Sequence, residues 1–446
     1  MKLIRNIRIL RNNRFQEANI LVSNDGKIIK IFRSSKGLNY FFSKVDQVYL
    51  GRNLILLPGF IDMHVHFREP GETFKEDFET GSKAAVAGGF VIVADMPNNK
   101  PEINSFELFS KKIELVSKKS YVDFLLYVSV PTVNELNMFM KSRVKPSGIK
   151  IYFYRKRDAE FFLHEELISE LLYIIHAEDG ELLREAKDCE SFKAFTRARP
   201  REAEISAIKK IISRLSSWEK NVYKQKRKPK IHITHLSTME GLILLTEARH
   251  KGLKITIDVT PHHLLLNETD GSKLGTWAKC YPPLRTKKDN NYLLYGLFTG
   301  KIDAIASDHA PHTIEEKSKS LCEAPGGIAS IQYVFPLLYT RIKKSSYENF
   351  PTLIRALSQN PARILGLDKR GSLRVGNFAD FVLFDNKCKW RIGEEYNFSK
   401  CKKTPYDGRT VLGKIISTFI RGELVYSDGV FLRKIGRYAT KIKQSH

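Results

Sequence analysis

Histidine and aspartate side chains follow short apolar segments at several points of this chain. His64 and His66 close the segment 54–66 (LILLPGFIDMHVH), and their spacing places both imidazoles on one side of an extended strand, about two strand rises apart. His176, His235 and Asp308 stand near the ends of three further apolar segments. Imidazole and carboxylate groups suit zinc, with iron, cobalt and manganese as alternatives. If the ends of these segments meet, the five side chains predict a metal site.

Lys150 is a second unusual residue, because it lies inside the apolar segment 148–154 (GIKIYFY). An ammonium group is costly to bury unless it is neutralised or paired with an acid. A salt bridge to a neighbouring carboxylate is one explanation. Chemical modification of the amine is the other, and the residue types alone leave both open.

The elements that must position these residues are short apolar segments alternating with amphipathic stretches. The predicted strands are 54–66, 90–97, 122–130, 148–154, 172–178, 230–236, 254–263 and 302–309, and helical stretches include 74–87, 202–215 and 238–249. Eight such units favour an α/β fold of the (β/α)8 TIM-type barrel class, with a doubly wound open sheet as the alternative. In a barrel, the strand ends that carry the candidate ligands share the carboxyl face, where barrel enzymes build active sites.

The two ends of the chain have a different pattern. Residues 3–32, 371–386 and 411–436 alternate apolar and polar residues around turn-forming glycines, with no helical period. Because isolated hairpins are marginal, we expect both ends to pair into one small β-sandwich domain. The predicted division is residues 1–53 and 370–446 for that domain, including a C-terminal tail, and residues 54–369 for the catalytic barrel.

Composition narrows the class of protein. Of 446 residues, 42% are hydrophobic and 28% are charged, which excludes collagen-like and largely disordered chains. The net charge of +25 raises nucleic acid or an anionic substrate as partners, but the basic run 224–230 lacks interleaved aromatic residues and nucleic-acid motifs, so we expect no nucleic acid. Five dispersed cysteines, no secretory leader and no long apolar stretch predict a cytoplasmic protein without a membrane span.

Several motifs together resemble the dihydroorotases of the amidohydrolase superfamily. They are PGFIDMHVHFREPG (58–71), MPNNKP (96–101), GIKIY, HAE, THL, TPHHL and ASDHAPH (306–312), with GSLRVGNFADFVLFD near the C-terminus. The resemblance implies two divalent metal ions, zinc by preference: His64, His66 and Asp308 at one, His176 and His235 at the other, and carboxylated Lys150 with a hydroxide bridging them. Asp308 would take a proton from the attacking water and return it to the leaving amide nitrogen.

The same resemblance implies the substrate. Arg68, Asn98 and His312 match residues that hold the substrate carboxylate, which predicts a small anionic substrate: N-carbamoyl-L-aspartate, cyclised reversibly to dihydroorotate in pyrimidine synthesis. Tyr281 departs from the pattern, because relatives commonly have a substrate-contacting Asn there. Allantoinase or hydantoinase activity on another cyclic amide is therefore an alternative. A non-catalytic relative is disfavoured, because every expected ligand is present, and a homo-oligomer or a docked enzyme of the same pathway stays open.

Overall fold

The structure is a computed structural model that describes residues 1–446 except 12–13, 34–38, 185–190, 221–227, 346 and 440–446. Most of the basic run 224–230, and Cys189, therefore lie outside the described residues. No helix in the described part of the chain is both long enough and apolar enough to cross a membrane.

Eight parallel strands form the barrel, as predicted. They are β6 (Phe60–Val65), β7 (Phe90–Asp95), β8 (Asp123–Leu126), β9 (Gly148–Tyr152), β10 (Leu172–His176), β11 (Lys230–Ile233), β12 (Ile255–Val259) and β13 (Ala304–Ile305). The ladders run β6-β7-β8 and β9 to β13 in order, and single parallel bridges, Val128 with Ile149 and Val65 with His309, join them at both seams. The open-sheet alternative is therefore excluded.

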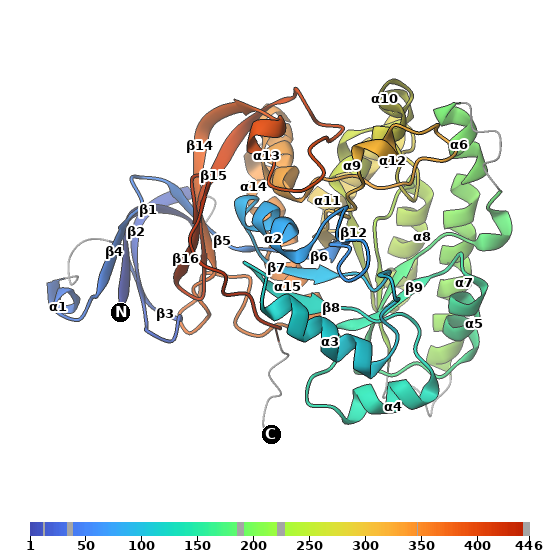
Figure 1. Ribbon diagram of the computed structural model, residues 1–446, viewed down its shortest axis with the longest axis horizontal. Helices are drawn as coiled ribbons and strands as arrows, with labels where there is room; N and C mark the ends of the chain where they lie inside the picture. Colours follow the sequence, from blue (N-terminus) through green and yellow to red (C-terminus); the bar gives the residue numbers. More distant parts are fainter. Residues whose placement is uncertain (12–13, 34–38, 185–190, 221–227, 346, 440–446) are drawn as a thin grey trace.

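Helices surround the barrel strands (Figure 1). The α-helices are α1 (Asn39–Phe42), α2 (Phe78–Ala87), α3 (Phe106–Ser117), α4 (Val133–Lys141), α5 (Lys156–His164), α6 (Phe192–Ala198), α7 (Arg201–Lys220), α8 (Met239–His250), α9 (Pro261–Leu265), α10 (Glu268–Leu274), α11 (Lys287–Phe298), α12 (Ile314–Lys317), α13 (Val334–Ser345), α14 (Phe350–Leu357) and α15 (Gln359–Leu365). Side-chain caps set where the predicted helices begin: Asp77 accepts from Thr80 N and starts α2 four residues later than expected, and Thr238 accepts from Gly241 N at the start of α8.

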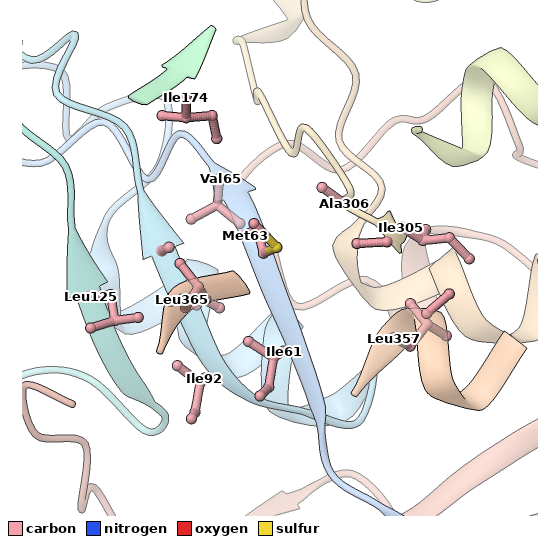
Figure 2. Packing of buried hydrophobic residues seen from close by; sticks show 14 of the residues in the cluster. Ile61, Met63, Val65, Ile92, Leu125, Ile174, Ile305, Ala306, Leu357 and Leu365 are labelled. Carbon is pink, nitrogen blue, oxygen red and sulfur yellow. The ribbon is translucent and has the colours of Figure 1, made fainter. Parts of the chain in front are cut away.

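Side chains along β6 alternate between an apolar face that packs in the core and a polar face that carries candidate site residues. Ile61, Met63 and Val65 belong to the large apolar core with Leu357 of α14 and Leu365 of α15, as Figure 2 shows. Because successive side chains of a strand point to opposite faces, Asp62 and His64 face the other side. Every residue of β6 is buried, so the polar face lies inside the barrel and not in solvent.

Both chain ends form the predicted small β-sandwich domain beside the barrel. Its strands are β1 (Lys2–Arg11), β2 (Arg14–Val22), β3 (Ile28–Phe32), β4 (Gln47–Leu50), β5 (Ile55–Pro58), β14 (Phe381–Arg391), β15 (Thr410–Ile420), β16 (Glu423–Ser427) and β17 (Val430–Phe431). They run in the order β17-β16-β15-β14-β5-β1-β2-β3, with β4 on β1, so strands from the two ends of the chain belong to one sheet (Figure 1). Strand β5 joins the halves, because it pairs with β14 on one side and β1 on the other.

The predicted single strand 54–66 is wrong in one respect: it is two strands that belong to different sheets. β5 ends at Pro58, and β6 begins at Phe60. Pro58 and Gly59 interrupt the run, and a Cβ at Gly59 would lie 2.5 Å from the Val91 side chain, so only glycine fits where the chain crosses to the barrel. The predicted domain limits at 53/54 and 369/370 stay predictions.

A buried ion network ties the β-sandwich domain to the barrel at the amino ends of the strands. Asp123, fully buried at the start of β8, accepts from Arg370 Nη2 at 2.6 Å and also from Arg421 Nη1. Arg370 reaches Asp380 with its other nitrogen, and the backbone N–H of Arg437 donates to Asp123 at 3.1 Å. One carboxylate therefore connects three segments of the C-terminal region to the barrel.

Asp123→Ala should lower the free energy of unfolding by roughly 3–5 kcal/mol, because it leaves buried guanidinium groups without their shared carboxylate. Chemical denaturation monitored by circular dichroism measures this change. Glu114→Ala is the matched control: its pair with Lys118 is exposed, so the loss should stay within about 1 kcal/mol. Equal losses in the two variants would contradict a central role for Asp123.

Candidate metal centre and active site

Three of the predicted ligands converge at the carboxyl mouth of the barrel. His64 Nε2 and His66 Nε2 lie 3.3 and 3.2 Å from Asp308 Oδ1, and the two nitrogens lie 3.2 Å from each other. These atoms come from the end of β6 and the loop after β13, which the bridge between Val65 and His309 brings together. Two imidazoles and a carboxylate at these separations make a candidate metal-binding group.

The other two histidines form a neighbouring pair. His176 ends β10, His235 lies two residues beyond β11, and His176 Nδ1 is 3.1 Å from His235 Nε2. The ring centroids of His64 and His235 are 5.2 Å apart, so the two groups of ligands are adjacent. His235 and Asp308 both have positive φ, at 42° and 46°. Such backbone strain in residues other than glycine is concentrated at functional sites.

Lys150 lies among these imidazoles with no neutralising partner. Its Nζ is fully buried and makes no hydrogen bond within the described residues, so the salt-bridge explanation of this lysine finds no support. Burial lowers the pKa of Lys150 to about 7. Burial, followed by the Lys150 charge, also lowers the pKa of His64 well below its ordinary value, which keeps that imidazole in the neutral form that binds metal.

The orphaned atoms support a metal centre. In the part of the chain that the structure describes, His235 Nδ1, like Lys150 Nζ, is buried without a hydrogen-bond partner. Buried polar atoms of this kind are rare and call for an explanation. The donor set consists of imidazoles, a carboxylate and an amine that faces them, and it fits divalent metal ions.

Outer residues that the sequence prediction missed hold the ligands in place. His64 Nδ1 lies 2.7 Å from Thr234 Oγ1, which donates to the buried Asp258 carboxylate, and Asp258 also accepts from His235 N at 2.6 Å. Hydrogen bonds to the second nitrogen of a metal-binding imidazole fix its tautomer and orientation. The sequence could have indicated Asp258, because it is a charged residue inside the apolar segment 254–263, just as Lys150 is a charged residue inside the segment 148–154.

The β-sandwich domain also reaches the catalytic face. Glu76, fully buried, accepts hydrogen bonds from Ser399 Oγ and from the backbone N–H of Lys400, and lies 3.4 Å from His309 Nε2. His309 is the chain neighbour of Asp308, and its Nδ1 accepts from Ser330 N at 3.1 Å. The C-terminal segment around Ser399 therefore supports the backbone that carries Asp308.

Arg68 and His312 come together as a buried polar pair. Arg68 Nη2 lies 3.1 Å from His312 Nε2, and Arg68 Nε donates to the carbonyl of Pro311 at 3.3 Å. Burial and the Arg68 charge lower the pKa of His312, so its neutral Nε2 accepts from Arg68 while Nδ1–H faces Glu316 at 3.2 Å. Within the described residues, Arg68 forms no ion pair with a carboxylate.

Asn98 is half-buried and contacts a candidate metal ligand. Its Oδ1 is 2.7 Å from His66 Nδ1, so the side chain orients a candidate ligand. The amide nitrogen is left as a donor. The sequence prediction assigned Asn98 only to the substrate, and the structure adds the contact with His66.

Tyr281 packs against Arg199 and Gly326. The Arg199 guanidinium lies 4.3 Å from the Tyr281 ring centroid, and a Cβ at Gly326 would lie 2.5 Å from that ring, so the ring packs on the glycine backbone. Arg199 also donates to Glu178, whose Oε2 lies 2.6 Å from His176 Nε2. Tyr281 is thereby connected to a candidate ligand through two residues that the sequence prediction did not assign.

The matching family model and the similar curated proteins point to the same family. The Amidohydrolase family model matches residues 55–425. The chain is 36% identical to the dihydroorotase of Methanothermobacter thermautotrophicus over 93% of this chain and 92% of that protein. It is 33% identical to a Staphylococcus aureus dihydroorotase over 96% and 99%, respectively.

Solved structures agree with this fold. The L-hydantoinase (dihydropyrimidinase) from Arthrobacter aurescens superposes with a TM-score of 0.87 at 24% identity, covering 98% of this chain and 99% of that one. At that identity the likeness speaks for the fold alone. The predicted family is confirmed: the chain belongs to the amidohydrolase family and, within it, with the dihydroorotases.

Proposed function

We propose that this protein is a metal-dependent dihydroorotase, which cyclises N-carbamoyl-L-aspartate to (S)-dihydroorotate with loss of water, reversibly, as a step of pyrimidine synthesis in the cytoplasm. The relatives named dihydroorotase support it over nearly the whole chain. The observation that carries the proposal is Arg68, a buried cation at the mouth of the site whose contacts in the described structure are neutral: the His312 imidazole and the Pro311 carbonyl.

The charge of Arg68 favours one class of cyclic amide. N-carbamoyl-L-aspartate and dihydroorotate carry a carboxylate that allantoin and simple hydantoins lack. A guanidinium presents a planar fork that matches a carboxylate, and a buried cation without an ion pair gains most from meeting one. His312 orients the fork, and the free amide nitrogen of Asn98 supplies a further donor. Tyr281, against Arg199 and Gly326, would form the wall opposite them.

Two divalent ions, zinc by donor type, complete the proposed centre. His64, His66 and Asp308 would hold one ion, His176 and His235 the other, and carboxylated Lys150 would serve both. When bound, such ions lower the pKa of a shared water and polarise the reacting carbonyl.

Lys150 suits carboxylation because of its surroundings. Carbon dioxide reacts with a neutral amine, and burial lowers the pKa of Lys150 to about 7, which makes the neutral form available near neutral pH. The product, a carbamate, carries a negative charge. The neighbouring imidazoles are neutral, so they cannot balance the positive charge of bound metal ions, whereas the carbamate can. An unmodified ammonium would repel those metals.

Asp308 is the proposed proton carrier. Burial raises the pKa of Asp308, but the adjacent His64 and His66 imidazoles outweigh it and keep that pKa below its ordinary value, so the carboxylate is ionised and can accept a proton from water. The same oxygen would return the proton to the amide nitrogen in the hydrolytic direction. The contact between His309 and Glu76 supports the backbone next to this carboxylate.

Arg68→Gln should lower kcat/KM on dihydroorotate by at least about ten- to a hundredfold, because a charge-assisted hydrogen bond is worth roughly 1.5–3 kcal/mol. Metal content should not change, because Arg68 is not a proposed ligand. Steady-state assays and metal analysis of the same preparation measure both. Unchanged turnover of dihydroorotate would remove the carboxylate-clamp argument and favour the allantoinase or hydantoinase alternative.

Lys150→Ala should lose bound metal and turnover together, with partial rescue of turnover by short carboxylic acids. Lys112→Ala is the control: Lys112 is equally buried but paired with Asp95, so it should lose stability and keep metal. Metal analysis and thermal unfolding of both variants separate these effects. Full metal occupancy in Lys150→Ala would exclude the bridging role.

In the metal-free protein, the free energy of unfolding should depend on pH in the way that the lowered pKa of Lys150 requires. The pKa of Lys150 is 10.5 in its ordinary state and about 7 in the folded chain, so between these values the unfolded chain binds the extra proton. The free energy of unfolding should therefore rise as pH increases across that window. Lys150→Met should lack this part of the slope in denaturation curves at a series of pH values, and identical slopes would contradict the lowered pKa.

A further inference from the structure

A second group of metal donors lies outside the proposed catalytic set. His262 and His263 stand in α9, directly after β12, and Cys280 follows the short 3-10 helix Gly275–Ala278. All three are buried, and one donor atom from each lies within 4.8 Å of the other two. Two imidazoles and a thiol form a donor set typical of zinc-class ions.

His262 is the clearest sign that something is missing from this cluster. Its side chain has no exposed surface, and within the described residues neither ring nitrogen makes a hydrogen bond. Leaving such a group unpaired costs free energy, so native proteins rarely do it. One of its nitrogens is among the donor atoms that face His263 and Cys280.

Pro282 supplies a fourth donor at the right separations. In the metal-free chain its carbonyl oxygen accepts hydrogen bonds from His263 Nε2 at 3.0 Å and from Cys280 Sγ at 3.3 Å. Ligand atoms around a tetrahedral zinc ion, with bonds of about 2.0–2.3 Å, are separated by roughly 3.3–3.8 Å. The Pro282 oxygen is already close to these separations, and the three side-chain donors, which lie within 4.8 Å of one another, would draw together when the ion binds. His263 Nδ1 lies 2.8 Å from Thr260 Oγ1, which is the outer hydrogen bond that a metal-bound imidazole usually makes.

The charged groups around the cluster indicate which ligand must balance the charge of a bound ion. The Asp308 and Glu178 carboxylates and the Arg285 guanidinium act on His263, and Asp308, Arg285 and the Lys317 ammonium act on Cys280. These formal charges offset one another, so the charge of a bound cation must be balanced mainly by its own ligands. Only Cys280 can supply an anion, by losing its thiol proton to solvent when the metal binds.

We propose that His262, His263, Cys280 and the Pro282 carbonyl bind one further zinc-class ion per chain, in addition to the catalytic ions. On binding, the single proton of His263 shifts from Nε2, where the Pro282 carbonyl accepts it in the metal-free chain, to Nδ1, where Thr260 accepts it, and the Nε2 lone pair goes to the metal. The ion joins the turn after β12 to the segment that carries Tyr281, so its occupancy fixes the wall of the substrate site. This site does not depend on the identity of the substrate.

Cobalt(II) tests the proposal because a cobalt–thiolate bond gives a charge-transfer band in the near ultraviolet. No proposed catalytic ligand contains sulfur, so that band cannot come from cobalt at the catalytic centre, while the visible d–d bands arise from cobalt at either site and report the total cobalt bound. Metal-free full-length protein titrated with cobalt chloride should develop the charge-transfer band to one equivalent per chain. Cys280→Ser should abolish the band, and Cys401→Ser, a matched buried thiol, should keep it.

His262→Gln provides an independent variant that leaves the thiol in place. It should need a higher cobalt concentration to reach the same charge-transfer absorbance, and it decides the question if Cys280→Ser does not fold. Absence of the band in wild-type protein that shows the d–d bands, or its persistence in Cys280→Ser, would overturn the proposal. Failure to turn over dihydroorotate would leave this result unchanged, so the two proposals fail separately.

Discussion

Desolvation at the carboxyl mouth of the barrel controls the chemistry of this protein. The strands that form the mouth are buried on both faces, so every charged group placed there loses its hydration. Lys150 meets that cost with a pKa lowered to about 7, and His64 by remaining neutral. Arg68 keeps its charge beside neutral partners, His312 and a carbonyl group. The site therefore presents neutral imidazoles and a buried guanidinium, and under the proposed function metal ions would meet the imidazoles and the substrate carboxylate would meet Arg68.

The β-sandwich domain serves this arrangement at two places. At the amino ends of the strands, Asp123 gathers Arg370 and Arg421 and secures the domain to the barrel. At the opposite end, Ser399 reaches Glu76, which supports His309 beside Asp308. The halves of the domain come from the two ends of the chain and meet at β5. A domain that is remote in sequence from the candidate ligands thus supports the backbone that carries one of them, Asp308.

Sequence patterns predicted the barrel and the convergence of His64, His66, His176, His235 and Asp308, because parallel strands bring their carboxyl ends to one mouth whatever their exact limits. They did not predict the break at Pro58 and Gly59, since two adjoining buried strands form one apolar run. Nor did they predict the link from His176 through Glu178 and Arg199 to Tyr281. That link depends on where the loop before α7 folds, and a cation packed on an aromatic ring leaves no periodic signal. The individual roles of the predicted site residues stay predictions.

The central claim is that the unpaired charge of Arg68 recognises the carboxylate of the substrate. The most direct measurement is kcat/KM of the zinc-loaded wild-type protein on dihydroorotate, allantoin and hydantoin, assayed side by side under one set of conditions. The account predicts that dihydroorotate is hydrolysed with the highest kcat/KM, because it alone of the three carries that carboxylate. Faster turnover of allantoin or hydantoin would contradict the claim.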